Sequence, residues 1–134
     1  MADRSVELFS AIYAKLSGDG ALTALIGDGH VYDHVAAGAL PPYVVIGDET
    51  ATDYASALVD AQEHTITLHA WSEKPTTLEV KRIMAAVRAA LHEQALTLSA
   101  GSCVQIRQEF KETSRDPDGY SHHGVMRFRA VTCG

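Results

Sequence analysis

The stretch EHTITLHAW, residues 63–71, carries the alternating pattern that decides the fold. Successive side chains of a β-strand point to opposite faces, so this stretch has two distinct sides. One side takes His64, Ile66, Leu68 and Ala70, and the other takes Thr65, Thr67, His69 and Trp71. The alternation predicts a half-buried strand, with one side against a core.

The residues that follow this strand have the period of an amphipathic helix. Thr76 and Glu79 have the spacing of a capping box, which predicts the start of the helix. The apolar stripe consists of Val80, Ile83, Met84, Val87 and Leu91, and the opposite side carries Lys81, Arg82, Arg88 and His92. We therefore expect a helix that packs its apolar stripe on the sheet.

Two further alternating runs, CVQIRQEFK (103–111) and GVMRFRAVT (124–132), predict a long C-terminal hairpin around the turn formers of residues 113–123. The expected buried sides are Val104, Ile106 and Phe110 in the first run, and Met126, Phe128 and Ala130 in the second. The expected outer sides are Gln105, Arg107, Glu109 and Lys111, with Val125, Arg127, Arg129 and Val131. This mixed-charge surface suits water or a polar protein interface.

Towards the N-terminus, the stretch ALPPYVVIGDE (39–49) begins another strand. Pro41 and Pro42 have no backbone N–H and exclude a helix, so the chain enters residues 43–46 already extended. Prolines are tolerated at a sheet edge or in the first residues of a strand. Residues 47–61 show no clear period and predict a mobile loop, which the rigid strand would aim towards a partner.

The first 27 residues predict two helices. Leu8, Ile12 and Leu16 form the stripe of a helix over residues 5–16, and Phe9 and Tyr13 widen it. A shorter helix follows, with Asp19 as its cap and Gly27 as its end. The expected fold is a single α+β domain over residues 1–134, with a mainly antiparallel four-stranded sheet, a long C-terminal hairpin and helices packed on one face.

The composition narrows the possible functions of the 134-residue chain. Its net charge of −6 argues against gripping nucleic acid, because binding to phosphates requires positive charge. No apolar run has the length of a membrane span, and the N-terminus lacks the pattern of a signal peptide, so we expect neither a membrane partner nor export. Cys103 and Cys133 have no metal-binding spacing and are expected to pack as small apolar residues.

The candidates for chemistry are weak, and we predict no catalytic residue, metal or cofactor. His64 and His69 lie an odd number of residues apart on one strand, and His122 and His123 are adjacent, so each pair points to opposite faces. The acids of residues 47–61 are expected to be solvated. Two alternatives stay open: a small metal-dependent hydrolase that uses His64 or His69 with a loop acid, and a small-molecule-binding module in the groove between helix and sheet.

The order of these segments resembles the tail-completion, or tail-terminator, family of long-tailed phages and gene transfer agents. The resemblance runs nearly end to end. It rests on PYVVIG (42–47), TITLHAWS (65–72), the helix after it and the final FRAVT (128–132). None of these is a catalytic signature, so their order and spacing carry the resemblance.

The resemblance implies a structural particle protein that is not an enzyme. Six copies would form a ring at the head-proximal end of the tail tube, end tube growth and join the tail to the neck. Its partners would be other copies of itself, the major tail tube protein and the head–tail connector or neck proteins, and DNA would pass through the ring without specific binding. We expect it in the host cytoplasm during assembly and then at the tail–neck junction of a virion or gene transfer agent.

The residues expected to make contacts in such a ring are chosen by their expected exposure, because no family motif identifies them. They come from the outer side of the sheet, the hairpin and the 47–61 loop. The candidate interface residues are Asp48, Glu49, Asp53, Tyr54, His69, Trp71, Arg107, Glu109, Arg127 and Arg129.

Overall fold

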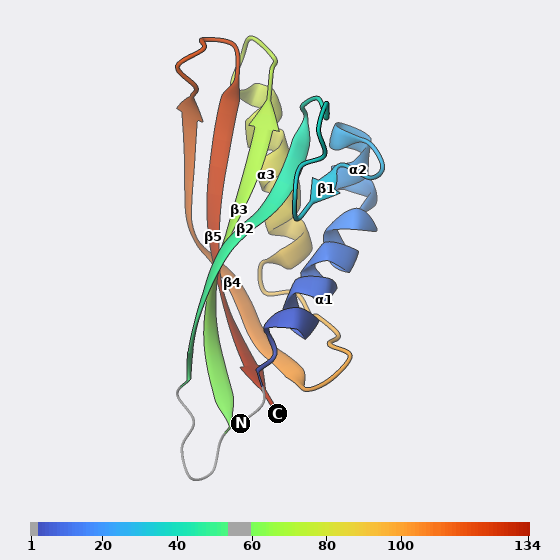
Figure 1. Cartoon of the computed structure of the whole chain (residues 1–134), viewed down its shortest axis with the longest axis vertical. Helices are drawn as coiled ribbons and strands as arrows, with labels where there is room; N and C mark the ends of the chain where they lie inside the picture. The colour runs from blue at the N-terminus through green and yellow to red at the C-terminus, as the bar shows by residue number, and fades with distance from the viewer. Residues whose placement is uncertain (1–2, 54–59) are drawn as a thin grey trace.

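The computed structural model describes residues 3–53 and 60–134 and has an α+β fold (Figure 1). Within these residues, three helices lie on one side of a long, strongly twisted sheet of five strands. The elements are α1 (Ser5–Ser17), α2 (Gly20–Ile26), β1 (Val31–Tyr32), β2 (Tyr43–Asp53), β3 (Ala61–Ser72), α3 (Leu78–Leu91), β4 (Ser102–Arg115) and β5 (His122–Cys133).

The sheet has the order β1-β2-β3-β5-β4 and is mixed. The expectation of a four-stranded sheet is wrong in this detail, because β1 pairs with β2 in parallel through Val31 and Tyr32. A strand of two residues has no period to detect. The other neighbours are antiparallel, and β4 and β5 form the predicted C-terminal hairpin.

The core lies between the helices and the inner faces of β3 and β5. The predicted inner residues of β3 (His64, Ile66, Leu68 and Ala70) and of β5 (Met126, Phe128 and Ala130) are all buried. Leu8, Ile12 and Leu16 of α1 and the predicted stripe of α3 are buried against them, whereas Tyr13 of α1 is 40% exposed. The main periods of these four elements are confirmed because nothing interrupts them.

The region predicted as a loop after Ile46 is largely strand. β2 continues to Asp53 and pairs with β3, so the expectation of a mobile loop is wrong for residues 47–53. A bulge at Gly47 and Asp48 shifts the register between the pairs Ile46↔Leu68 and Glu49↔Ile66. This insertion breaks the alternation, so the pattern was not recognisable as a strand. Tyr54 lies outside the described residues.

Two bulges also correct the expected faces of β4. The register shifts between Cys103 and Gln105 and again between Gln108 and Phe110. Val104 is 64% exposed and Phe110 is 39% exposed, whereas Ile106 is fully buried as predicted. Each inserted residue reverses the faces that follow it. Phe110 therefore lies on the side of the sheet away from the helices.

The starts of the helices are predicted with mixed success. The Asp19 carboxylate accepts a hydrogen bond from the Leu22 amide, which confirms the cap of α2. The capping box of α3 is formed only in part: the Thr76 hydroxyl accepts a hydrogen bond of 3.2 Å from the Leu78 amide, where the helix starts, but Glu79 does not complete the box. Glu79 instead accepts a hydrogen bond of 2.7 Å from the Ser72 hydroxyl at the end of β3. Glu79 thus bonds to Ser72 of β3 and not to the start of its own helix.

Replacing Gly47 with alanine is expected to lower the free energy of unfolding by about 1–3 kcal/mol. A Cβ at this position would stand 2.9 Å from the Thr67 carbonyl oxygen and 2.9 Å from the His69 ring. The carbonyl belongs to the paired strand and has little freedom to move. Urea unfolding measures the change, with Gly20→Ala as control, because a Cβ there meets nothing within 4 Å. Equal stability of the two variants would contradict the tight bulge.

Candidate assembly surface

The side of the sheet away from the helices, here called the outer face, is the largest candidate surface for assembly. None of the described helices lies on it (Figure 1). The strand register places Thr65, Thr67, His69 and Trp71 of β3, Val125, Arg127 and Arg129 of β5, and Arg107 and Phe110 of β4 on this face. It combines arginines with aromatic rings, a composition typical of protein interfaces.

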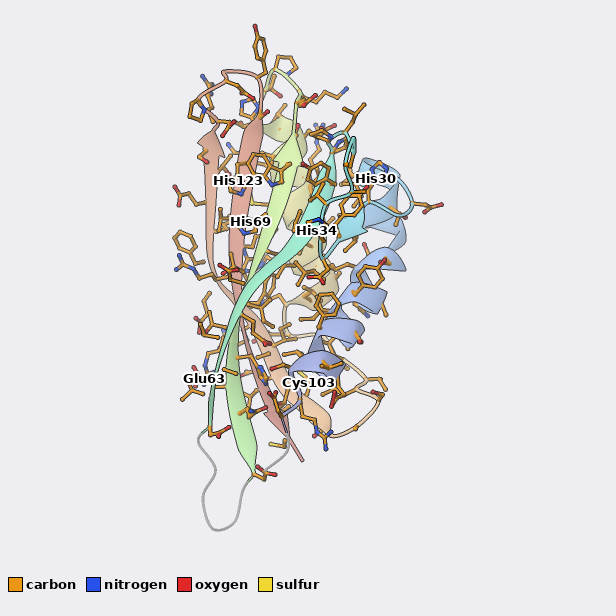
Figure 2. The ribbon with its side chains drawn as sticks, viewed as in Figure 1. His30, His34, Glu63, His69, Cys103 and His123 are labelled. Atoms are coloured by element: carbon orange, nitrogen blue, oxygen red, sulfur yellow. The ribbon has the colours of Figure 1, made fainter. Side chains whose placement is uncertain are left out.

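An aromatic cluster occupies one end of the outer face. Trp71 stacks on His123 with ring centroids 4.0 Å apart and an interplanar angle of 6°. His123 also lies beside His69, with 2.8 Å between His123 Nε2 and His69 Nδ1 (Figure 2). At this distance one nitrogen donates a hydrogen bond to the other, so the pair requires at least one neutral ring.

The environment of the two histidines favours their neutral forms. Burial lowers the pKa of His69, and the nearby Asp48 carboxylate opposes that shift. Burial also lowers the pKa of His123, and His69 lowers it further, while Asp116 and Glu112 oppose the shift. Desolvation disfavours the charged imidazolium in both cases.

These shifts predict a loss of stability on acidification. Because the folded-state pKa values lie below the ordinary histidine value of about 6.5, the unfolded chain binds more protons as the pH falls past 6.5. The contribution of the pair is therefore complete above pH 6.5 and is lost as the pH falls through the lowered pKa values. Urea unfolding between pH 7.5 and 5.5 should show a smaller decrease in His123→Gln than in the original chain. An equal decrease would contradict the prediction.

Arginines of β5 and of the edge strand β4 lie further along the outer face. Arg129 binds Glu63 at 2.7 Å, and this hydrogen bond lowers the pKa of the Glu63 carboxyl. The guanidinium of Arg127 lies 4.6 Å from the centre of the Phe110 ring. Arg107 is opposite Arg129 in the register, and its side chain reaches Glu93 at 3.4 Å. The contacts hold these cations in place at a half-exposed surface.

The structure brings only some of the predicted interface residues together. His69, Trp71, Arg107, Arg127 and Arg129 share the outer face. Asp48 lies at the bulge of β2, and Glu109 lies at a bulge of the edge strand β4. Both residues are exposed.

Glu49 and Asp53 have contacts within the subunit that the sequence did not suggest. Glu49 Oε2 lies 3.1 Å from Nδ1 of the buried His64, on the inner side of the sheet. The Asp53 carboxylate accepts a hydrogen bond from the Gln62 side chain. Both residues are exposed, as expected, but they lie on a strand and not in a loop.

The histidines and cysteines do not converge on a site. His64 and His69 lie on opposite faces of β3, as predicted, and His122 is buried while His123 belongs to the aromatic cluster. Within the part of the chain that the structure describes, no group of three or more His, Cys, Asp or Glu side chains is arranged to hold a metal ion. Burial raises the pKa of the Cys103 thiol, which keeps it from acting as a ready nucleophile.

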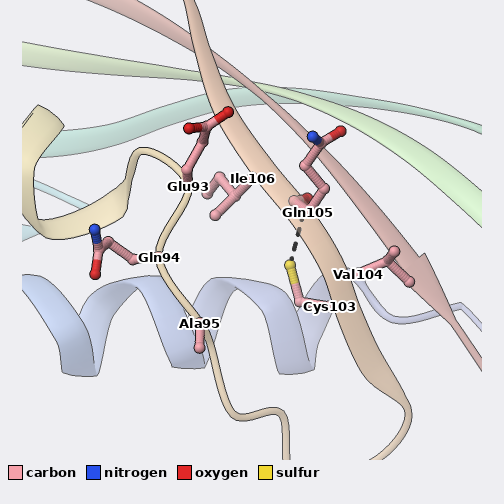
Figure 3. Close-up of a pocket in the computed structure, with 7 residues that line it drawn as sticks. All are labelled: Glu93, Gln94, Ala95, Cys103, Val104, Gln105 and Ile106. Carbon is pink, nitrogen blue, oxygen red and sulfur yellow. Dashed lines mark hydrogen bonds between the residues drawn. The ribbon is translucent and has the colours of Figure 1, made fainter.

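The pockets of the described residues are either open or small, which argues against a small-molecule site. A hollow of about 330 Å³ lies between β4 and the segment after α3, and most of its lining residues, among them Glu93 and Val104, are exposed (Figure 3). A pocket between α1 and the sheet, where the groove was expected, measures only about 60 Å³. Ligand sites are usually enclosed and have volumes of roughly 300–1,000 Å³. Neither pocket combines that size with enclosure.

No helix in residues 3–53 and 60–134 is both long enough and apolar enough to cross a bilayer.

Comparison with known proteins agrees with a role in assembly. The family model described as "Tail completion protein gp17" matches residues 10–133. The chain belongs to this family. A curated relative, tail completion protein gp17 of Bacillus phage SPP1, is 28% identical over 88 residues, which cover 66% of this chain and 65% of the relative. The family is thus one of phage tail completion proteins.

A solved structure extends the similarity over the whole length. A chain in the virion of a native gene transfer agent particle superimposes with a TM-score of 0.91, at 27% sequence identity and with 100% of both chains covered. The tail completion fold of this chain is thus similar to that of a particle component from end to end.

Proposed function

We propose that this tail completion protein forms a ring, with six copies, at the head-proximal end of a tail tube. The ring ends tube growth and joins the tail to the neck proteins. The main support for this proposal is the full-length similarity to a chain of a gene transfer agent virion, together with the match to the tail completion family. The protein would assemble in the host cytoplasm and remain at the tail–neck junction of the particle.

The surface of the subunit supports this proposal. The outer face presents Trp71, Arg127 and Arg129 to solvent, supported by contacts within the sheet. Arginine and aromatic residues are enriched in protein interfaces, and contacts already in place reduce the entropy lost on binding. This face therefore suits docking to the tube or to neck subunits.

The net charge supports a ring through which DNA passes. At −6, the chain repels a polyanion on average and offers little non-specific affinity. A channel made from such subunits would let DNA slide without holding it. The sequence-based expectation of no specific DNA contact follows from the same charge.

Electron microscopy of the purified protein mixed with tail tubes tests the proposal. We expect a ring at one end of each tube, and we expect deletion of the gene to give tubes of uncontrolled length that remain unjoined to heads. Normal tails joined to filled heads in the deletion strain would refute the function. A Trp71→Ala, Arg127→Ala variant should cap fewer tubes, while Tyr13→Ala on the exposed side of α1 serves as control.

A further inference from the structure

The charges of the chain are divided along its length. Residues 16–73 contain no lysine or arginine. The acids in this span are Asp19, Asp28, Asp33, Asp48, Glu49, Asp53, Asp60, Glu63 and Glu73. In the remainder of the chain, acids and bases are mixed and bases are more numerous. The net charge of −6 therefore belongs to one part of the molecule.

In the fold, the acidic span and the basic part of the chain lie at opposite edges of the sheet. The acidic span builds α2, β1, β2 and β3, which reach one edge of the sheet. The span that carries most of the bases builds α3, β5 and β4, and β4 is the opposite edge (Figure 1). Because β1 covers only Val44 and Val45, the rest of β2 is an edge too.

The acidic edge, defined as Asp28, Asp33, Asp48 and Asp53, lies along β1 and β2. All four side chains belong to exposed residues. β2 contains Asp48, Glu49 and Asp53 and no base, and Glu49 is held by His64. This edge consequently presents carboxylates to solvent without a neighbouring cation from its own strands.

The basic edge, defined as Arg88, Arg107, Lys111 and Arg115, lies along β4. Three of these residues are on β4, and Arg88 of α3 reaches it through a hydrogen bond to the Gln108 side chain. The acids beside them are Glu109 and Glu112 on β4, Asp116 directly after it, and Glu93, which contacts Arg107. This edge therefore mixes four bases with four acids, whereas the strands of the acidic edge supply no lysine or arginine.

The backbone of β4 limits how a partner can dock there. The Ile106 carbonyl accepts a hydrogen bond from the Glu93 amide, and the Gln108 amide donates one to His92 Nδ1. These groups point away from β5 and are already satisfied by the segment after α3. A partner strand therefore cannot extend the sheet at Ile106–Gln108, which leaves contact through side chains.

We propose that copies of this chain meet head to tail, with the acidic edge of one copy against the basic edge of the next. Two different surfaces in contact form a heterologous interface, which closes into a ring when the rotation between copies is right. Complementary charges fix the order of the copies and oppose like-edge contacts. The inference rests on the proposed ring and specifies which surfaces form it.

Charge reversal tests the pairing of the edges. The acid-reversed variant carries Asp28→Lys, Asp33→Lys and Asp48→Lys, and the base-reversed variant carries Arg107→Glu, Lys111→Glu and Arg115→Glu. Each alone brings like charges together at every contact, so association should weaken about tenfold or more at low salt. An equimolar mixture should recover association, because the two variants can alternate around an even-numbered ring.

Sedimentation velocity of the full chain, alone and with tail tubes, gives the readout in whichever setting the original chain associates. A control with Lys15→Glu and Arg82→Glu reverses exposed charges that belong to neither edge and should associate normally. Added salt should weaken the original contacts. Circular dichroism and urea unfolding confirm that each variant folds.

The outcomes separate the two proposals. If the original chain caps tubes and the reversed variants associate as well as the control does, the edge pairing is wrong and the ring stands. Loss of association without recovery in the mixture also overturns the edge pairing. If the original chain neither associates nor caps tubes, the proposed function itself fails.

Discussion

Replacing Phe128 with alanine is expected to lower the free energy of unfolding by about 3–5 kcal/mol. Phe128 is fully buried on β5, opposite Ile66 of β3 and Gln108 of β4 in the register. Removal of the ring loses apolar contacts and leaves a cavity that a sheet bonded on both sides cannot close. Urea unfolding should show a lower midpoint with an unchanged slope.

The adjacent residue provides the control for this prediction. Arg127 lies on the outer face, with its guanidinium over the Phe110 ring. Arg127→Ala removes that contact and opens no cavity in the core, so it should cost about 1 kcal/mol or less. Losses of equal size in the two variants would contradict the assignment of β5 faces.

The faces of β3 and β5 were predictable because each strand alternates without interruption. His64 and Phe128 were both assigned to the inner side, and both are fully buried. The stripe of α3 was predictable for the same reason, since 3.6-residue periodicity continues through the helix. In these elements the local pattern and the tertiary packing agree.

The bulges mark the limit of this reasoning. An inserted residue at Gly47–Asp48 hides the second half of β2, and two insertions in β4 move Phe110 to the outer face. A bulge depends on the partner strand as much as on the strand that contains it, so one strand's sequence does not reveal it. Gly47 was the available signal, because a glycine within a strand often marks a bulge.

The candidate surface was predictable in part for a similar reason. Trp71, Arg127 and Arg129 follow from alternation alone and share the outer face. The contact between His69 and His123 joins residues 54 positions apart and depends on the register of β3 with β5. The contact of Glu49 with His64 depends on the bulge in β2. Such pairs require the relative placement of two strands.

Replacing His64 with leucine is expected to lower the free energy of unfolding by about 2–4 kcal/mol, although leucine is more apolar. The imidazole is fully buried, with Nδ1 3.1 Å from Glu49 Oε2 and Nε2 2.8 Å from Thr132 Oγ1. It thus links β2, β3 and β5. Without it, the hydroxyl of Thr132, a residue only 1% exposed, and the partly covered Glu49 carboxylate lose a partner.

A double-mutant cycle separates the hydrogen bonds from packing. In His64→Leu, Thr132→Val, no buried hydroxyl is left unsatisfied, so the pair should be more stable than the sum of the single changes predicts, by about 1 kcal/mol. Thr65→Val, at the next position on the outer face, is the control and should change stability little. Strict additivity would show that His64 stabilises the sheet by filling space. A positive coupling would instead show that the hydrogen bond between His64 and Thr132 links β3 to β5 beyond what packing supplies.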